Sequence, residues 1–271
     1  MAAIVTEYDD RDVPAPSPEM EAMMEAGVHW GHARSKRHPA MMPYLWGTRS
    51  NVEVIDLTKT CEKLAEALVF LSERASKGKL ILFVGTRPSA RHLVKETAEA
   101  LGYPYVDQRW IGGTLTNFKV ILKRVETLES LEQEQASGGF EKYTKKERLR
   151  KDEEMTRLRQ HFDGLRRLRR IPDVIVIIDI GHDHLALSEA RRLKIPVVAL
   201  TDTNTDPRLV SYAIPSNDDA RPAVRYMLER MKAALREGQE HPAAPPGEAP
   251  VIPPAEKVAD PEGVNAVPSA Q

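Results

Sequence analysis

The segment 107–119, DQRWIGGTLTNFK, carries side chains suited to binding an anionic partner that contains rings. Arg109 stands next to Trp110, and a cation beside an indole can neutralise a phosphate while the indole stacks on a base. The paired glycines Gly112 and Gly113 would let the backbone approach such a partner closely. Nucleic acid is a partner of this kind, so the segment is a candidate contact to it.

The same segment also has structural interpretations. Its glycines can form the turn from a strand into a helix, Trp110 can brace that join, and Asn117 can cap a helix that begins at Phe118. Arg109 and Lys119 are the residues of the segment that we expect to face phosphate.

Residues 27–52 form a second basic and aromatic stretch, which contains no acidic residue. Its aromatic side chains could pack inward while its cations face phosphate, because long basic side chains can lie along apolar surface and keep their charge in water. An arm that only covers the core is the alternative. The aromatic residues are Trp30, Tyr44 and Trp46, and the cations are Arg34, Lys36, Arg37 and Arg49.

Four arginines crowd into residues 166–170, where Leu168 is the remaining residue. Ion pairs between neighbouring turns of a helix, such as Glu153 with Arg157, account for part of the basic charge before these arginines but not for the arginines themselves. We therefore expect them to contact phosphate, and Lys123 is a further expected contact. This arginine cluster consists of Arg166, Arg167, Arg169 and Arg170.

Histidines gather at two places in the chain. No H-E-x-x-H pattern is present to place two metal ligands and an attached base on one helix face, so we predict no metal site and no catalytic residue. The histidines are His29, His32 and His38, and His182 with His184 on either side of Asp183.

The turn 85–88, Gly-Thr-Arg-Pro, lies between an expected strand and helix, which is where open α/β sheets bind phosphate. Neither G-x-G-x-x-G nor G-x-x-x-x-G-K-[ST] occurs, so the turn is predicted to be a simple connection and no nucleotide cofactor is expected. We interpret Asp218 and Asp219 as residues that cap a helix. Asp202 and Asp206 lie in a loop after a strand, where an α/β active site would also lie.

Length and composition are those of a globular protein, with 271 residues of which 41% are hydrophobic. Cys61 is the single cysteine, which excludes an internal disulfide and a multi-cysteine zinc site. No apolar run approaches the roughly 18 residues of a membrane span, and the acidic start resembles no secretory leader. A soluble protein that is not exported is expected.

Charge is distributed unevenly along the chain. Residues 1–26 hold seven acidic residues and one arginine, and residues 237–271 hold six acidic residues and one lysine. Because the whole chain has a net charge of −1, the part between them has a net charge of +10. Such a basic region is the electrostatic pattern expected of a protein that neutralises phosphates.

Apolar strand patterns alternate with helical patterns, which is typical of a parallel sheet covered on both faces by helices. The predicted fold class is therefore α/β. Strands are expected at 52–57, 80–84, 105–106, 174–178, 197–200 and 212–214, and helices near 58–76, 88–101, 184–193 and 218–236.

The insertion at about 117–170 is too long for an ordinary crossover between two strands. Apolar residues step by three and four in two arms, one before and one after Gly138 and Gly139, which predicts an antiparallel helical hairpin or short coiled coil. Each arm of roughly 20 residues would reach about 30 Å. The apolar positions are Phe118, Ile121, Val125 and Leu128 in the first arm and Met155, Leu158, Phe162 and Leu165 in the second.

The chain is expected to hold one α/β domain, 19–236, which contains the hairpin. It follows an acidic, flexible N-terminal extension, 1–18. A tail rich in Pro, Ala and Glu, 237–271, is expected to be disordered.

Seven motifs, in this order, resemble those of the family of the second protein of the bacterial and organellar small ribosomal subunit, ribosomal protein S2. Together they extend over about residues 20–236. The motifs are EAGVHWGHARSKRH at 25–38, IDLTKT at 55–60, LFVGT at 82–86, DQRWIGGTLTNFK at 107–119, RIPDVIVIID at 170–179, EARRLKIPVVALTDTNTDP at 189–207 and IPSNDDA at 214–220.

The resemblance implies a flavodoxin-like parallel sheet with an inserted coiled-coil hairpin, and a structural, non-enzymatic role in the small ribosomal subunit. It implies binding to ribosomal RNA and to neighbouring ribosomal proteins, including the large messenger-binding protein built from OB-folds, in the cytoplasmic ribosome. No cofactor, membrane contact or homo-oligomer is expected. The resemblance does not extend to either end of the chain, and Arg87-Pro88 replaces the Lys-rich turn usual in the family.

Two other classes of protein are alternatives. A nucleotide-binding α/β enzyme would use the carboxyl ends of the strands near Gly85, Asp179 and Asp202, and the lack of both phosphate-binding patterns argues against it. A protein adaptor that presents a coiled coil would bind its partner without RNA and with little dependence on salt.

Overall fold

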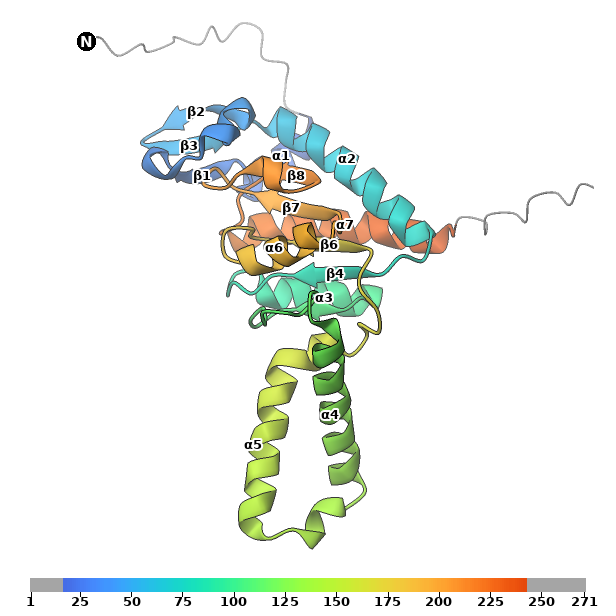
Figure 1. The fold of residues 1–271 in the computed structure, drawn as a ribbon. Helices are drawn as coiled ribbons and strands as arrows, with labels where there is room; N and C mark the ends of the chain where they lie inside the picture. Colours follow the sequence, from blue (N-terminus) through green and yellow to red (C-terminus); the bar gives the residue numbers. More distant parts are fainter. Residues whose placement is uncertain (1–16, 243–271) are drawn as a thin grey trace, which may run out of the picture.

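A five-stranded parallel sheet forms the centre of the protein in the computed structural model, which describes residues 17–242 (Figure 1). The strands lie in the order β5-β4-β6-β7-β8, and every neighbouring pair is parallel. Counted along the chain this order is 2-1-3-4-5, one of the common doubly wound orders. The strands are β4 (Ile81–Val84), β5 (Tyr105–Val106), β6 (Val174–Ile177), β7 (Val197–Thr201) and β8 (Tyr212–Pro215).

Helices cover both faces of this sheet, as the buried strands require. Alternate strand residues such as Phe83 and Val176 pack against α2 (Leu57–Ser76), α3 (Arg91–Leu101) and α7 (Arg221–Glu240). Their neighbours in the strands, such as Val84 and Ile177, pack on the other face against α6 (His184–Arg192) and the base of the hairpin. The prediction of an α/β fold with a parallel sheet is confirmed.

A separate three-stranded antiparallel sheet precedes the parallel sheet, and the sequence did not predict it. Its order is β1-β3-β2, and α1 (Pro18–Glu25) comes before it, with Ser17 as N-cap. The strands are β1 (Trp30–Ala33), β2 (Leu45–Arg49) and β3 (Val52–Ile55).

The prediction that residues 52–57 belong to the parallel sheet is wrong. They supply β3, the centre of the small sheet, and Leu57 already belongs to α2, for which Asp56 is the N-cap. Ser50 and Asn51 have φ angles of 49° and 65° and join β2 to β3. Positive φ at both positions is the geometry of a tight hairpin turn, so an antiparallel partner lies immediately before the strand.

The inserted hairpin projects from the sheet as two helices, α4 (Phe118–Ala136) and α5 (Lys145–Phe162) (Figure 1). Both predicted arms are present. The predicted apolar positions Ile121, Val125 and Leu128 face Met155, Leu158 and Phe162 in one buried cluster. At the tip, Gly138 adopts a φ of 75°, and a capping box of Thr144 and Glu147 starts α5.

Helix α7 ends at Glu240 rather than at the predicted Arg236. Gly238 lies against the carbonyl oxygen of Ser72 on α2, at a point where a Cβ would come within 2.3 Å of that oxygen. The two helices therefore stay packed to the end of α7. The predicted acidic extension and tail fall mainly on residues 1–16 and 243–271, outside the described residues.

Short 3₁₀ helices complete the described chain and connect the longer elements. They span Arg34–Lys36, Pro39–Tyr44, Gly139–Lys142, Asp163–Leu165 and Pro207–Leu209. No helix within residues 17–242 is long and apolar enough to cross a membrane.

Candidate nucleic-acid interface

The loop between β5 and α4 is organised by one carboxylate, that of Glu189 on α6. Its Oε1 accepts hydrogen bonds from the indole nitrogen of Trp110 at 3.0 Å and from the amide of Gly113 at 2.7 Å. Its Oε2 accepts from the amides of Leu115 and Thr116 at 2.9 and 3.0 Å, and from the Thr116 hydroxyl at 3.1 Å. Burial acts to raise the pKa of Glu189, but these hydrogen bonds outweigh it and lower the pKa.

Segment 107–119 contains both buried structural residues and exposed cations. Trp110 is buried, with 4% of its surface exposed, and Gly113 has a φ of 90°, so the brace and the turn are confirmed. Asn117 occupies the N-cap position of α4, but its side chain makes no capping hydrogen bond. Arg109 and Lys119 are exposed and form no ion pair with any residue in 17–242.

The basic stretch 27–52 is arranged differently from the prediction. Its aromatic residues do not all pack inward: Trp46 is 59% exposed and Trp30 is 38% exposed. Arg37 bonds at 3.1 Å to the buried carboxylate of Glu53, which also accepts from the Thr48 hydroxyl at 2.8 Å. Arg37 therefore anchors the small sheet.

The other three cations of this stretch are available to a partner. They are exposed, and none forms an ion pair within the described part of the chain. These cations are Arg34, Lys36 and Arg49.

Three of the four arginines in the cluster form ion pairs with acidic residues. The prediction that ion pairs do not explain this cluster is therefore wrong for these three. Arg166 bonds to Glu132 at 2.7 and 2.8 Å and to Asp163 at 2.8 Å. The hydrogen bonds from Arg166 are the main cause that lowers the pKa of Glu132 to about 2. Single ion pairs hold Arg169 to Glu129 and Arg170 to Asp173, both at 2.7 Å.

Arg167 is the member of the cluster without an ion pair among the described residues. It is exposed and lines an open cavity of about 470 Å³ beside the C-terminal ends of α2 and α3. Lys79, Arg169 and Arg170 line the same cavity, so its mouth is cationic.

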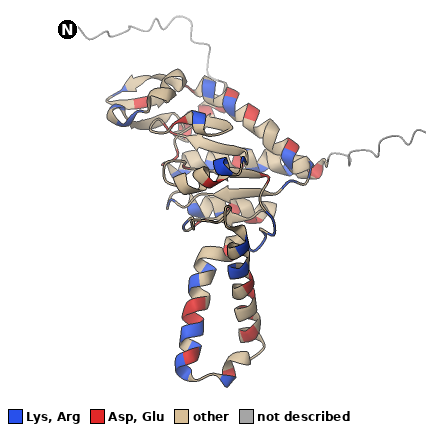
Figure 2. Cartoon of the chain, viewed as in Figure 1, with Lys and Arg blue, Asp and Glu red and all other residues tan. Residues whose placement is uncertain are grey.

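Further exposed cations lie on α4 and α6. Lys123 is exposed, like Lys119 one turn earlier on α4. Arg191, Arg192 and Lys194 are exposed at the C-terminal end of α6, close to the loop that Glu189 holds, and sequence reasoning had not selected them. Figure 2 shows basic and acidic residues interspersed along α5, whereas in α4 the basic residues lie near the sheet and the acidic residues lie toward the tip, so the number of cations alone does not identify a contact surface.

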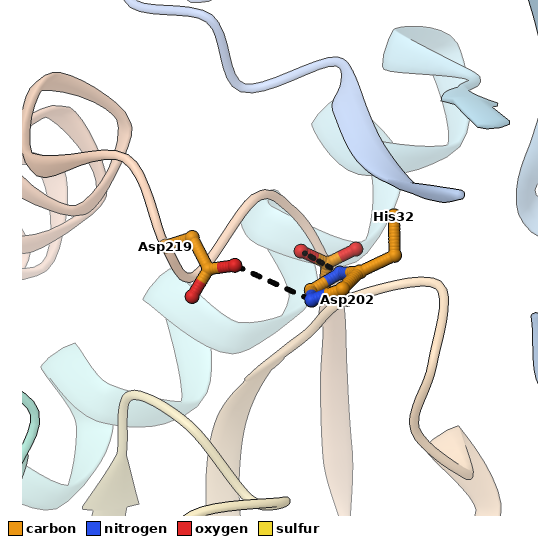
Figure 3. Close-up of side chains that lie close together, drawn as sticks. All are labelled: His32, Asp202 and Asp219. Carbon is orange, nitrogen blue, oxygen red and sulfur yellow. Dashed lines mark ion pairs between the residues drawn. The ribbon is translucent and has the colours of Figure 1, made fainter. Parts of the chain in front are cut away.

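His32 meets two carboxylates at the carboxyl end of the parallel sheet (Figure 3). Its Nδ1 lies 3.1 Å from Oδ2 of Asp202, and its Nε2 lies 3.3 Å from Oδ2 of Asp219. The hydrogen bond with Asp202 is the main cause that raises the pKa of His32. One ligand atom from each of the three lies within 4.8 Å of the others, a donor set that could hold a divalent ion.

Sequence spacing could not indicate this convergence, because the three residues come from separate motifs. The prediction that no metal binds is not tested and stays a prediction. The other histidines have separate places: His38 accepts a hydrogen bond from the amide of Ala40 at 3.2 Å, and His182 and His184 are exposed.

A model of the family described as ribosomal protein S2 matches residues 23–238. The chain belongs to the ribosomal protein S2 family. It is accordingly a structural, non-enzymatic protein of the small ribosomal subunit with a role in translation. Membership implies small-subunit ribosomal RNA and ribosomal proteins as partners, and the ribosome as location.

The crevice that an α/β enzyme would use is filled with ion pairs in this member of the ribosomal protein S2 family. The guanidinium of Arg87 lies 3.1 Å from Asp179 and 3.5 Å from Asp218, and it also pairs with Asp219. Burial is the main cause that raises the pKa of Asp218, to about 8. A Cβ on Gly85 would come within 2.6 Å of Val94 on α3, so this glycine serves helix packing rather than phosphate binding.

The predicted role of Asp218 and Asp219 as capping residues is wrong. Ala220 is the N-cap of α7 and no side chain caps the helix, whereas Asn217 holds the turn before it, because its Oδ1 accepts hydrogen bonds from the amides of Asp219 and Ala220, both at 2.9 Å. Asp206, in the loop after β7, bonds to the amide of Arg208 at 3.0 Å and starts a 3₁₀ helix. These acids have structural roles in place of the catalytic role that the enzyme alternative would give them.

Proposed function

We propose that the chain binds small-subunit ribosomal RNA by neutralising phosphates, and that it recognises RNA shape more than base sequence. The observation that supports this is a set of exposed cations without acidic partners among residues 17–242. A cation that is already paired must give up its acid before it gains a phosphate, whereas an unpaired one gains the phosphate directly. The unpaired members of the expected set are Arg34, Lys36, Arg49, Arg109, Lys119, Lys123 and Arg167.

The remaining expected contacts have structural partners. Arg37, Arg166, Arg169 and Arg170 can reach a phosphate only while they share or exchange a carboxylate. We propose that these four position the RNA-binding surface and add less to affinity than the unpaired cations.

We propose that the parallel sheet is a flavodoxin-like scaffold and that the hairpin is a short coiled coil which extends the surface available to RNA. The strand order and the packed apolar stripe of the hairpin support this proposal. On this proposal the chain is present as a monomer in the cytoplasmic ribosome.

Contacts with neighbouring ribosomal proteins, including the large messenger-binding OB-fold protein, are part of the proposal. Exposed Trp30 and Trp46 of the small sheet, with Met42 just before β2, support them. Trp30 of β1 and Gly47 of β2, the residue after Trp46, both pair with Val54 of β3, so the two tryptophans lie near each other in the sheet, and exposed apolar patches are typical of protein interfaces.

The salt dependence of RNA binding tests the proposed function. The affinity of the full chain for small-subunit ribosomal RNA should fall roughly 10³-fold or more between 50 and 200 mM salt if about six phosphates are neutralised. Changing both Lys119→Gln and Lys123→Gln should lower the slope of log affinity against log salt by about two. The control is Lys63→Gln, which removes one charge from a lysine already paired with Glu66. Binding that does not respond to salt would overturn the proposal.

A further inference from the structure

A groove of about 430 Å³ lies along the hairpin. Arg124 of α4 and Arg150, Arg157 and His161 of α5 line it. Side chains seven and four residues apart lie on one face of a helix, so the three α5 residues form a stripe opposite Arg124. Arg150 and Arg157 are about 10 Å apart along the helix axis at 1.5 Å per residue.

The opposite edge of the hairpin differs from the groove edge in that its charged side chains are paired. There each acid of α4 that faces α5 already has a basic partner: Glu129 pairs with Arg169, and Glu132 pairs with Arg159 and Arg166. Closer to the tip, Glu134 pairs with Lys151 at 2.8 Å. That edge is closed by ion pairs from α4 to α5 and to the segment that follows α5.

On the groove edge, by contrast, the arginines have no acidic partner among the described residues. Arg124, Arg150 and Arg157 form no ion pair within residues 17–242. The expected pair of Glu153 with Arg157 is also not formed, so that prediction is wrong. The positive charge of the groove is available to an external anion.

His161 adds a polar atom that needs a partner. Its Nδ1 is buried and has no hydrogen-bond partner among the described residues. A buried polar atom without a partner costs free energy, which a ligand can recover by supplying the missing bond. The phosphate oxygen of RNA accepts a hydrogen bond, and the ribose 2′-hydroxyl can donate or accept one, so a nucleotide suits either tautomer.

We propose that this groove binds the sugar-phosphate backbone of ribosomal RNA. The proposal rests on the proposed function and adds a binding site, with Arg124 and Arg157 as the main phosphate ligands. One strand of a nucleic-acid helix carries a charge about every 3.4 Å along its axis, so several phosphates can lie along the stripe. Glu153 and Glu154 also line the groove, between Arg150 and Arg157 on the same face of α5, so their charge opposes the attraction of the arginines for phosphate.

The test compares two changes of charge on the same hairpin. The double variant Arg124→Gln with Arg157→Gln should reduce the slope of log affinity for small-subunit ribosomal RNA against log salt by about two. The full chain is used, and the melting temperature should stay unchanged because neither arginine has an ion pair in 17–242 to lose. The control is Arg159→Gln on the opposite edge, where Arg166 still neutralises Glu132.

The outcomes distinguish a failure of the groove proposal from a failure of the proposed RNA-binding function. A double variant that binds like the wild type, or a control that loses as much binding per charge, would overturn the groove while leaving the proposed function intact. Wild-type binding without salt dependence would overturn both. As a change in the opposite direction, Glu153→Gln with Glu154→Gln should tighten RNA binding, and unchanged or weaker binding would contradict the site.

Discussion

Glu189 on α6 accepts a hydrogen bond at 3.0 Å from the indole nitrogen of Trp110, 79 residues earlier in the chain. The same carboxylate accepts from three backbone amides of the loop that follows Trp110. The join between the sheet and the hairpin therefore depends on a single side chain from a different element. Arg109 and Lys119 flank the part of the loop that this carboxylate binds.

We expect Glu189→Ala to destabilise the protein by about 3 kcal/mol, because it leaves buried donors without an acceptor. Urea unfolding followed by circular dichroism measures this loss. RNA binding should weaken as well, since the loop that spaces Arg109 from Lys119 loses its anchor. Ser188→Ala on the exposed side of α6 removes a hydrogen bond to the carbonyl of His184 and should change stability little. Equal stability of the two variants would contradict the role of Glu189.

The arginine cluster gives a second prediction, in which two neighbouring arginines act differently. Arg166→Gln should lower the free energy of unfolding by about 1 kcal/mol, because Glu132 and Asp163 lose a shared partner. Arg167→Gln should leave stability unchanged and weaken RNA binding. Melting temperature and RNA affinity, measured for both variants, separate the two roles. The distinction fails if Arg167→Gln melts early or if both variants bind RNA equally well.

A third prediction concerns pH. Hydrogen bonding to Asp202 raises the pKa of His32 above 6.5, so its contribution to stability is complete below that value and is lost as pH rises through the folded pKa. Asp218 acts in the same direction, because its folded pKa of about 8 lies above the unfolded value of 3.8. The charged groups facing them are Asp179, Asp202, Asp219, Arg87 and Lys36.

The free energy of unfolding should therefore decrease between about pH 4, where Asp218 ionises in the unfolded chain, and about pH 8, where it ionises in the folded protein. Asp218→Asn should flatten this dependence, because the amide has no charged form to bury. Urea titrations at several pH values measure it. The control is Asp206→Asn, because hydrogen bonds from Arg208 lower the pKa of Asp206 to about 2, below this range. A variant at Asp218 that keeps the full wild-type pH dependence would show that this carboxyl does not titrate in the range.

Periodicity alone predicted the elements that are long or completely buried. The steps of three and four from Ile121 to Leu128 and from Met155 to Phe162 specify the hairpin, because a helix with one apolar stripe needs a second helix to cover it. A short apolar run such as 52–57 suits a parallel or an antiparallel strand equally well. The turn at Ser50 and Asn51 decides between them, and its residue types are a weaker signal than Asn-Gly.

The binding surface could be predicted only in part, because exposure depends on partners that are distant in sequence. Arg166 and Arg167 look alike in the sequence, yet Glu132 reaches one of them and not the other. His32, Asp202 and Asp219 likewise come from three motifs and meet only when the sheet has formed. A single sequence gives the type and number of the charges, whereas the fold decides which of them remain unpaired.

A fourth prediction tests the packing of α7 on α2. Gly238→Ala should lower the free energy of unfolding by about 1–3 kcal/mol, because its Cβ would come within 2.3 Å of the Ser72 carbonyl oxygen and would push the helices apart. The matched control is Gly47→Ala in β2, where a Cβ would meet no atom within 4 Å. Thermal unfolding of both variants measures the difference. In an isolated helix alanine is more favourable than glycine by about 1 kcal/mol, so a Gly238 variant of unchanged or increased stability would show that the end of α7 does not pack as described.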